Sequence, residues 1–129
     1  MPTEPPPVGT FAGRHVLAEL GGVEAAVLDD EPFLRTTVAR TLAASNATVC
    51  EVISHRFQPQ GVTVLALLAE SHASIHTYPE IGTAFVDVFT CGDRADPERA
   101  VRLLAESLGA TLDALSTVER GPQPGRPVP

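Results

Sequence analysis

Basic runs, cysteine motifs and long apolar stretches are all missing from this chain of 129 residues. The formal net charge of −7 and the lack of a basic run argue against binding to a nucleic-acid backbone. No apolar stretch approaches the roughly 20 residues that a membrane span needs. Residues 1–7 have neither the basic nor the apolar region of a secretory signal, so we expect a cytoplasmic protein.

Cysteine is scarce, since only Cys50 and Cys91 occur. A domain of this length buries roughly two-thirds of the surface of its unfolded chain, so it can fold without disulfides or a structural metal. We therefore expect two free thiols in a reducing compartment. The sequence has no Cys-x-x-Cys or His-Glu-x-x-His pattern. His72 and His76 would be about 13 Å apart on a strand, so we predict no metal site.

Proline and glycine are concentrated at the two ends of the chain. Their density in residues 1–12 and 121–129 predicts disordered tails. The length between the tails fits a single domain, which we place at residues 13–120.

Apolar and β-branched patterns predict a helix at residues 30–45, a second helix that follows Asp96 and ends at Gly109, and six strands. We expect the strands at residues 15–20, 48–57, 62–69, 74–78, 83–90 and 111–118. Consecutive strands are joined by short turns, which favours antiparallel pairing. The sequence thus predicts an α+β fold, a two-layer sandwich of an antiparallel sheet with two helices packed on one face.

The most unusual segment is a polar block at residues 70–80, directly after the most apolar run at residues 62–69. Burying a polar group without a partner costs about 2 kcal/mol or more, so such a block is either fully hydrogen-bonded or chemically used. Ser71 is not in a Gly-x-Ser-x-Gly elbow, so a hydrolase triad is not indicated. Cys91, at a strand end, fits either core packing or proton donation.

Several segments together resemble the bacterial and archaeal S-adenosylmethionine decarboxylase proenzymes. They are residues 70–72 (Glu-Ser-His), 75–80 (Ile-His-Thr-Tyr-Pro-Glu) and 87–92 (Asp-Val-Phe-Thr-Cys-Gly). Residues 13–19, 46–48 and 55–62 match the same family in the same order, so the resemblance covers the whole predicted domain.

The resemblance implies that the chain cuts itself between Glu70 and Ser71 into chains of 70 and 59 residues. Ser71 would become a pyruvoyl group, which forms a Schiff base with the substrate amine, so neither a metal nor pyridoxal phosphate is expected. His76 would be the proton acceptor in processing, and Cys91 the proton donor in decarboxylation. Alternation along a flat strand puts Ser71 and His76 on opposite faces, so we expect Ser71 in the turn before the strand.

The family likeness also suggests how a substrate is bound. Phe57 would stack on adenine, and Glu80 would hold the ribose hydroxyls. The sites of this family lie between two protomers, so we expect a homodimer of cleaved protomers. The product would serve spermidine biosynthesis.

One segment departs from the family pattern, which usually reads Gly-Val-Ser-Gly where residues 61–64 are Gly-Val-Thr-Val. Thr63 keeps the serine's hydroxyl, whereas Val64 in place of glycine is expected to narrow the space beside the strand. Phe57 and Glu80 favour S-adenosylmethionine as the substrate. Ornithine or arginine is the second reading, and an uncleaved, non-catalytic binding or regulatory paralogue is the third.

Overall fold

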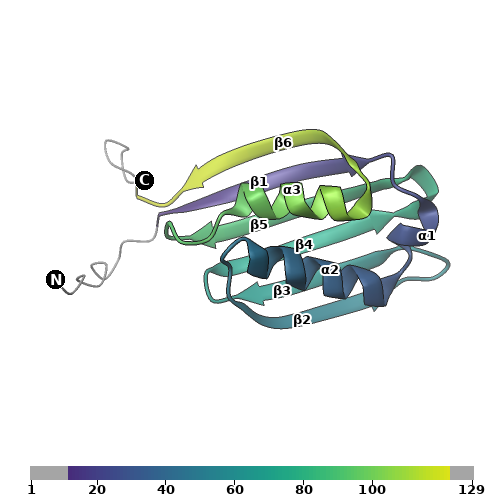
Figure 1. The fold of residues 1–129 in the computed structure, drawn as a ribbon, viewed down its shortest axis with the longest axis horizontal. Helices are drawn as coiled ribbons and strands as arrows, with labels where there is room; N and C mark the ends of the chain where they lie inside the picture. Colours follow the sequence, from purple (N-terminus) through teal and green to yellow (C-terminus); the bar gives the residue numbers. More distant parts are fainter. Residues whose placement is uncertain (1–11, 123–129) are drawn as a thin grey trace.

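The computed structural model describes residues 12–122, which form one antiparallel sheet of six strands in the order β2-β3-β4-β5-β1-β6 (Figure 1). The strands are β1 (Gly13–Gly21), β2 (Val49–Arg56), β3 (Val62–Leu68), β4 (Ser71–Tyr78), β5 (Thr83–Cys91) and β6 (Thr111–Arg120). The tails predicted at the two ends fall almost entirely outside the described residues.

Two long helices cover one face of the sheet, α2 (Glu31–Ala44) and α3 (Pro97–Leu108). The carboxylates of Asp30 and Asp96 accept the backbone N–H groups of the first turns, and Gly109 ends α3 with a φ of +66°. Both predicted helices are therefore confirmed. A short α1 (Ala25–Leu28) and the 3₁₀ turn η1 (Pro79–Ile81) were not predicted. No helix within residues 12–122 is long and apolar enough to cross a membrane.

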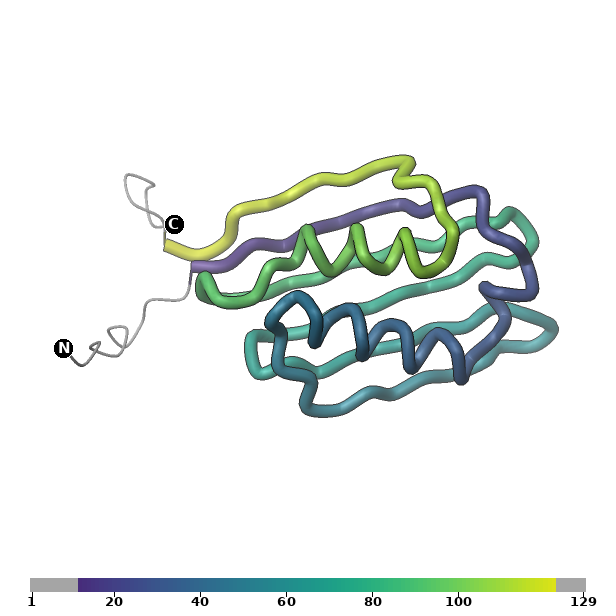
Figure 2. The backbone as a smooth tube through the Cα atoms, viewed as in Figure 1, coloured from purple at the N-terminus to yellow at the C-terminus, as the bar shows by residue number. Residues whose placement is uncertain are grey.

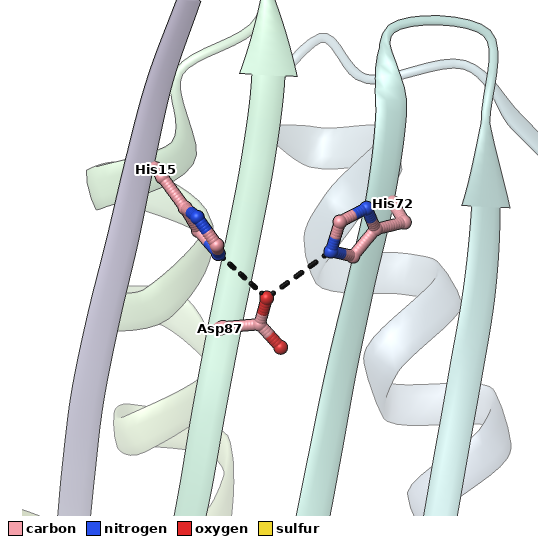
Figure 3. A group of neighbouring side chains, drawn as sticks. All are labelled: His15, His72 and Asp87. Atoms are coloured by element: carbon pink, nitrogen blue, oxygen red, sulfur yellow. Dashed lines mark hydrogen bonds and ion pairs between the residues drawn. The ribbon is translucent and has the colours of Figure 1, made fainter. Parts of the chain in front are cut away.

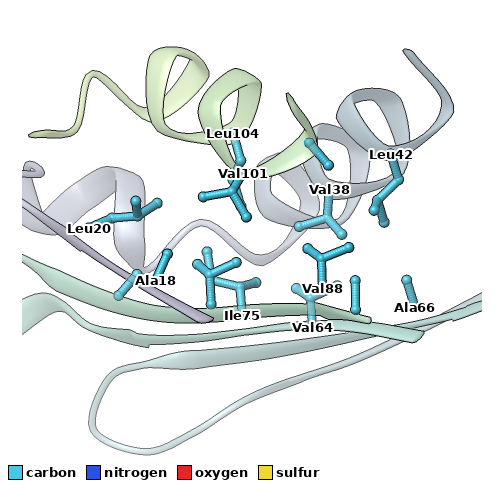
Figure 4. Close-up of a cluster of buried hydrophobic side chains, with 14 of the residues drawn as sticks. Ala18, Leu20, Val38, Leu42, Val64, Ala66, Ile75, Val88, Val101 and Leu104 are labelled. Carbon is cyan, nitrogen blue, oxygen red and sulfur yellow. The ribbon is translucent and has the colours of Figure 1, made fainter. Parts of the chain in front are cut away.

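The hydrophobic core lies between the helices and the sheet (Figure 4). Leu34, Val38 and Leu42 come from α2 and belong to the same buried cluster as Val64 and Ile75 of the sheet. The predicted two-layer α+β sandwich is thus confirmed. Because both helices pack on the same side, the other side of the sheet is left without a covering layer in the described part of the chain.

We call this uncovered side the open face. It carries His15, Leu17 and Glu19 of β1, Thr63, Leu65 and Leu67 of β3, His72, Ser74 and His76 of β4, and Phe85, Asp87 and Phe89 of β5. Many of these side chains are apolar and exposed, as Leu65 (43%) and Leu67 (48%) are. The most apolar run of the sequence is therefore buried on one side only, because only one face of β3 is covered.

Strand β4 begins three residues earlier than predicted. Ser71 pairs with Leu68 of β3 and Thr90 of β5, and the turn before it consists of Ala69 and Glu70. The polar residues at its start resemble a turn in sequence, but a neighbouring strand on each side supplies their backbone partners. Ser71 is thus the first residue of the strand, not part of the turn.

Two buried threonines predict opposite effects of the same substitution. Thr77 Oγ1 donates to Leu28 O (2.6 Å) and accepts from Val62 N–H (2.8 Å). Thr90 Oγ1, in contrast, is buried without a hydrogen-bond partner among the described residues. Thr77→Val should lower the free energy of unfolding by about 2 kcal/mol, because it leaves buried backbone groups without a hydrogen-bond partner. Thr90→Val should leave the free energy of unfolding unchanged or raise it. Urea unfolding of both variants tests this, and equal losses would contradict it.

Candidate active site

The Glu70–Ser71 peptide is fixed at one end of the sheet. The Glu70 carboxylate accepts hydrogen bonds from Thr48 N–H (2.9 Å) and from the Thr48 hydroxyl (3.2 Å). The Glu70 carbonyl oxygen accepts one from Cys91 N–H (2.9 Å), at the end of β5. This peptide carbonyl is therefore polarised by a backbone donor, and it cannot turn away without breaking these contacts.

Ser71 has a φ of +156°, which residues with a side chain rarely adopt. Such a conformation costs on the order of 1–3 kcal/mol and persists only where the surroundings enforce it. Here the surroundings are the pairing with β3 and β5 and the anchoring of Glu70. Backbone strain is therefore present at the bond where the sequence predicts cleavage.

The Ser71 hydroxyl is next to a cluster of ionisable side chains on the open face. Ser71 Oγ lies 3.2 Å from His72 Nδ1. The Nε2 atoms of His72 and His15 lie 3.2 Å and 2.7 Å from the same oxygen of Asp87 (Figure 3). The other oxygen of Asp87 accepts a hydrogen bond from the hydroxyl of Ser74. Strand alternation would turn Ser71 toward the helices, but its hydroxyl is held at this cluster.

Asp87 is ionised at neutral pH. Burial disfavours its charge, but the hydrogen bonds from Ser74 and His15 and the nearby imidazoles of His72 and His15 outweigh this effect and lower the pKa of the carboxyl below its ordinary value. Asp87 is therefore an acceptor for every group that faces it.

The same cluster contains a possible set of metal ligands. One ligand atom from each of His15, His72 and Asp87 lies within 4.8 Å of the others, and two imidazoles with a carboxylate are a set that zinc accepts. Sequence spacing spoke against His72 and His76 as a ligand pair, and it gave no reason to consider His15 and Asp87. Because β1 and β5 pair only in the folded sheet, the local pattern contained no signal for this grouping beyond polar residues on alternate positions.

His76 forms a second, separate group with Thr63. Thr63 Oγ1 lies 3.0 Å from His76 Nδ1, and the two residues are directly paired across β3 and β4. Val64 is fully buried on the helix side, so any space that it narrows is not on the open face. His76 is five residues from Ser71 along β4, which corresponds to about 16 Å. Within one protomer the predicted proton acceptor therefore does not reach Ser71.

The loop between β2 and β3, which contains Phe57, and η1, which contains Glu80, lie at the end of the sheet opposite to the start of β4 (Figures 1 and 2). Phe57 is 47% exposed in the loop between β2 and β3, and Glu80 is exposed in η1. Asp29 anchors this loop by accepting hydrogen bonds from Arg56 (2.6 Å) and Gly61 N–H (2.9 Å). These two hydrogen bonds keep the pKa of Asp29 below its ordinary value, and the bond from Arg56 has the larger effect. Phe57 and Glu80 are thus accessible to a ligand.

A groove of about 590 Å³ runs across the open face. Its lining includes Leu17, Glu19, His76, Phe85 and Ser116. Most of this surface is apolar, with the imidazole of His76 as one of its few polar groups. Ser74 and Asp87 also line the groove, so it adjoins both the His76 group and the cluster beside Ser71.

The structure brings Glu70, Ser71 and Cys91 together at one end of the sheet, whereas Thr63 and His76 lie farther along it and Phe57 and Glu80 at the opposite end. The Ser71 end combines a hydroxyl nucleophile, an adjacent imidazole and a polarised peptide carbonyl. This combination fits the class of proteins that react at their own backbone.

Comparison with known proteins agrees with this class. Residues 14–121 match the family model of S-adenosylmethionine decarboxylase. The S-adenosylmethionine decarboxylase proenzyme of Prochlorococcus marinus (strain MIT 9313) is 55% identical over 110 residues, 85% of this chain and 88% of the relative. That of Clostridium tetani is 43% identical over 109 residues, 84% of this chain and 86% of the relative.

A solved structure shares the fold. The adenosylmethionine decarboxylase of Aquifex aeolicus superposes with a TM-score of 0.74 at 36% identity, which covers 87% of this chain and 91% of the other. The chain belongs to the S-adenosylmethionine decarboxylase proenzyme family, as the resemblance in its sequence indicated.

Proposed function

We propose that this protein is a self-processing decarboxylase that acts on S-adenosylmethionine. The observation that carries the proposal is the geometry of the Glu70–Ser71 peptide, whose carbonyl is bound by Cys91 N–H beside a serine of strained backbone. The names of the relatives give the substrate, and the exposed Phe57 and Glu80 are suited to hold its adenosyl group.

Processing begins at this peptide. Ser71 Oγ attacks the Glu70 carbonyl carbon, the peptide C–N bond breaks, and an ester with a free amine on Ser71 results. His76 then removes the Cα proton of Ser71 while the Glu70 carboxylate leaves from Cβ. Tautomerisation and addition of water release ammonia and leave a pyruvoyl group at residue 71. The residues present fit the group, because it is made from Ser71 itself.

The pyruvoyl group supplies a ketone that binds the substrate amine and takes up the electron pair as carbon dioxide leaves. Cys91 follows Thr90, the strand partner of Ser71, and this neighbourhood supports a role for its thiol in returning a proton to the substrate carbon. This role requires a reduced thiol, and Cys91 is a free cysteine. We therefore place the enzyme in a reducing compartment such as the cytoplasm.

The distance between Ser71 and His76 requires a second copy of the chain. If two open faces pack together about a twofold axis, the Ser71 end of one protomer can meet the His76 end of the other. The exposed apolar side chains of Leu17, Leu65, Leu67, Phe85 and Val118 would be buried in this contact. Each active site would then combine Ser71 and Cys91 of one protomer with residues of its partner.

Substrate recognition depends on the far end of the sheet. Phe57 offers an exposed ring for stacking on adenine, and Glu80 offers a carboxylate for the ribose hydroxyls. Thr63 holds the imidazole of His76 through its hydroxyl. Ornithine and arginine have neither an adenine nor a ribose, so these contacts favour S-adenosylmethionine. The decarboxylated product would be the aminopropyl donor for spermidine.

Release of carbon dioxide from the purified protein tests the proposed substrate. We expect release from S-adenosylmethionine and none above background from ornithine or arginine offered under the same conditions. Cys91→Ala is the matched control, since it keeps the backbone N–H and should still be cleaved, but should turn over about 10²-fold more slowly or worse. Release from ornithine or arginine alone would overturn the substrate assignment.

A further inference from the structure

The reaction proposed above needs a base for the hydroxyl proton of Ser71. A serine hydroxyl is a weak nucleophile until an adjacent group takes its proton. His76 lies about 16 Å away along β4 in the same protomer, and its proposed role concerns a different proton, that on Cα. His72 Nδ1, in contrast, lies 3.2 Å from Ser71 Oγ.

The hydrogen bonds of His72 determine which of its nitrogens can act as the base. Asp87 is ionised and can only accept, so His72 Nε2, at 3.2 Å from the carboxylate, carries the ring hydrogen and donates it. A neutral imidazole has one ring hydrogen, and Nδ1 is therefore left with a free lone pair. That lone pair is on the nitrogen that faces the Ser71 hydroxyl.

Other groups around Asp87 keep this arrangement in place. His15 Nε2 donates to the same carboxylate oxygen, and Arg120 Nη1 lies 3.4 Å from His15 Nδ1. The ring of Phe89 packs against both imidazoles, with centroids 5.2 Å from that of His15 and 5.9 Å from that of His72. Asp87 of β5 thus lies between His15 of β1 and His72 of β4 and binds both imidazoles, as Figure 3 shows.

We propose that His72 is the general base that takes the hydroxyl proton of Ser71 in the first step of self-cleavage, and that Asp87 is the positioning residue that fixes its tautomer. This inference rests on the proposed function, because it assigns a residue to the processing reaction.

The step is balanced without any co-reactant. The proton of Ser71 Oγ moves to His72 Nδ1 while Oγ bonds to the Glu70 carbonyl carbon. The developing negative charge on the Glu70 oxygen is stabilised by Cys91 N–H at 2.9 Å. His72 then gives the proton to the nitrogen of Ser71 as the C–N bond breaks. The products are the ester and a free amine, and the imidazole is neutral again.

The test follows the conversion of the 129-residue chain to its two products over time by intact mass. His72→Ala should be cleaved at least about 10²-fold more slowly than the wild type. Added imidazole should restore part of the rate, which a variant that merely fails to fold would not show. His55→Ala, an exposed histidine on β2 outside the cluster, is the matched control and should be cleaved at the wild-type rate.

Hydroxylamine separates the two histidines, because it cleaves esters far faster than peptide bonds. His76→Ala should accumulate the ester and yield fragments with hydroxylamine, whereas His72→Ala should stay intact. Hydroxylamine fragments from His72→Ala in the amount seen with His76→Ala, or cleavage of this variant at the wild-type rate, would overturn the inference. If the wild type is also uncleaved, the proposed function itself has failed.

Asp87 is tested through its dependence on His72. Asp87→Asn should slow cleavage in the wild-type background and have no further effect in the His72→Ala background, because residues that act as a unit are not additive. Additive effects would remove Asp87 from this role. Cleavage should also be unchanged by EDTA and by added zinc. Dependence on a metal would overturn the tautomer assignment, since a metal on Nε2 would replace its hydrogen bond to Asp87.

Discussion

Ser71→Ala is expected to remain a single uncleaved chain near 13.6 kDa that releases no carbon dioxide from S-adenosylmethionine. Without Oγ no ester can form at the Glu70 carbonyl, and without the ester no pyruvoyl group arises at residue 71. The loss should be complete, because the residue supplies both the nucleophile of processing and the atoms of the prosthetic group. Intact mass and carbon dioxide release measure the two consequences in the same preparation.

Ser107→Ala is the matched control for this variant. Ser107 lies on α3, where its hydroxyl donates to Leu103 O, and it is not part of the proposed site. It should be cleaved and active like the wild type. Decarboxylation by uncleaved Ser71→Ala would show that the prosthetic group has been assigned wrongly.

The second large effect concerns two inactive variants produced together. Alone, neither His76→Ala nor Ser71→Ala should form a pyruvoyl group. In a mixed dimer, Ser71 of the His76→Ala chain faces the intact His76 of its partner, so this chain should be processed. We expect no processing of the His76→Ala chain on its own and processing of most His76→Ala chains in mixed dimers. An affinity tag on one variant and intact mass of the 71–129 product measure it.

The control replaces the Ser71→Ala partner by a chain that carries both substitutions. This partner lacks His76, so processing should disappear again. If the wild type is processed but the mixed dimer is not, the site does not combine residues of two protomers, and the packing of open faces must be abandoned.

The sequence was sufficient for those parts of the fold that depend on local signals. Asp30 and Asp96 mark helix starts because their carboxylates bind N–H groups within the first turn, and Gly109 marks an end because few other residues adopt its positive φ. The short connections fixed the antiparallel pairing. The first residue of β4 was predicted wrongly because the strand is extended to Ser71 by its pairing with Thr90, which is distant in sequence.

The candidate site was accessible to sequence reasoning only in part. Ser71, His76 and Cys91 were identified through the family resemblance, and their roles stay predictions. The cluster around Asp87 was missed because His15 is 72 residues away from it in sequence and meets it only by the pairing of β1 with β5. Strand alternation puts Leu65 and Leu67 on the same face of β3. Which face of the sheet the helices cover cannot be read from that alternation, so the exposure of these two residues could not be predicted.

The strand order determines how the two products of cleavage are held together. The proposed cut between β3 and β4 would divide the middle of the sheet, and β1 of the first product would lie between β5 and β6 of the second. Neither product retains a continuous sheet, so the two are interlocked through backbone hydrogen bonds. The intact chain folds as one molecule, but the mature enzyme, once denatured, has to reassemble from two chains at a rate that depends on concentration. Cleavage thus turns a folding reaction into an assembly reaction.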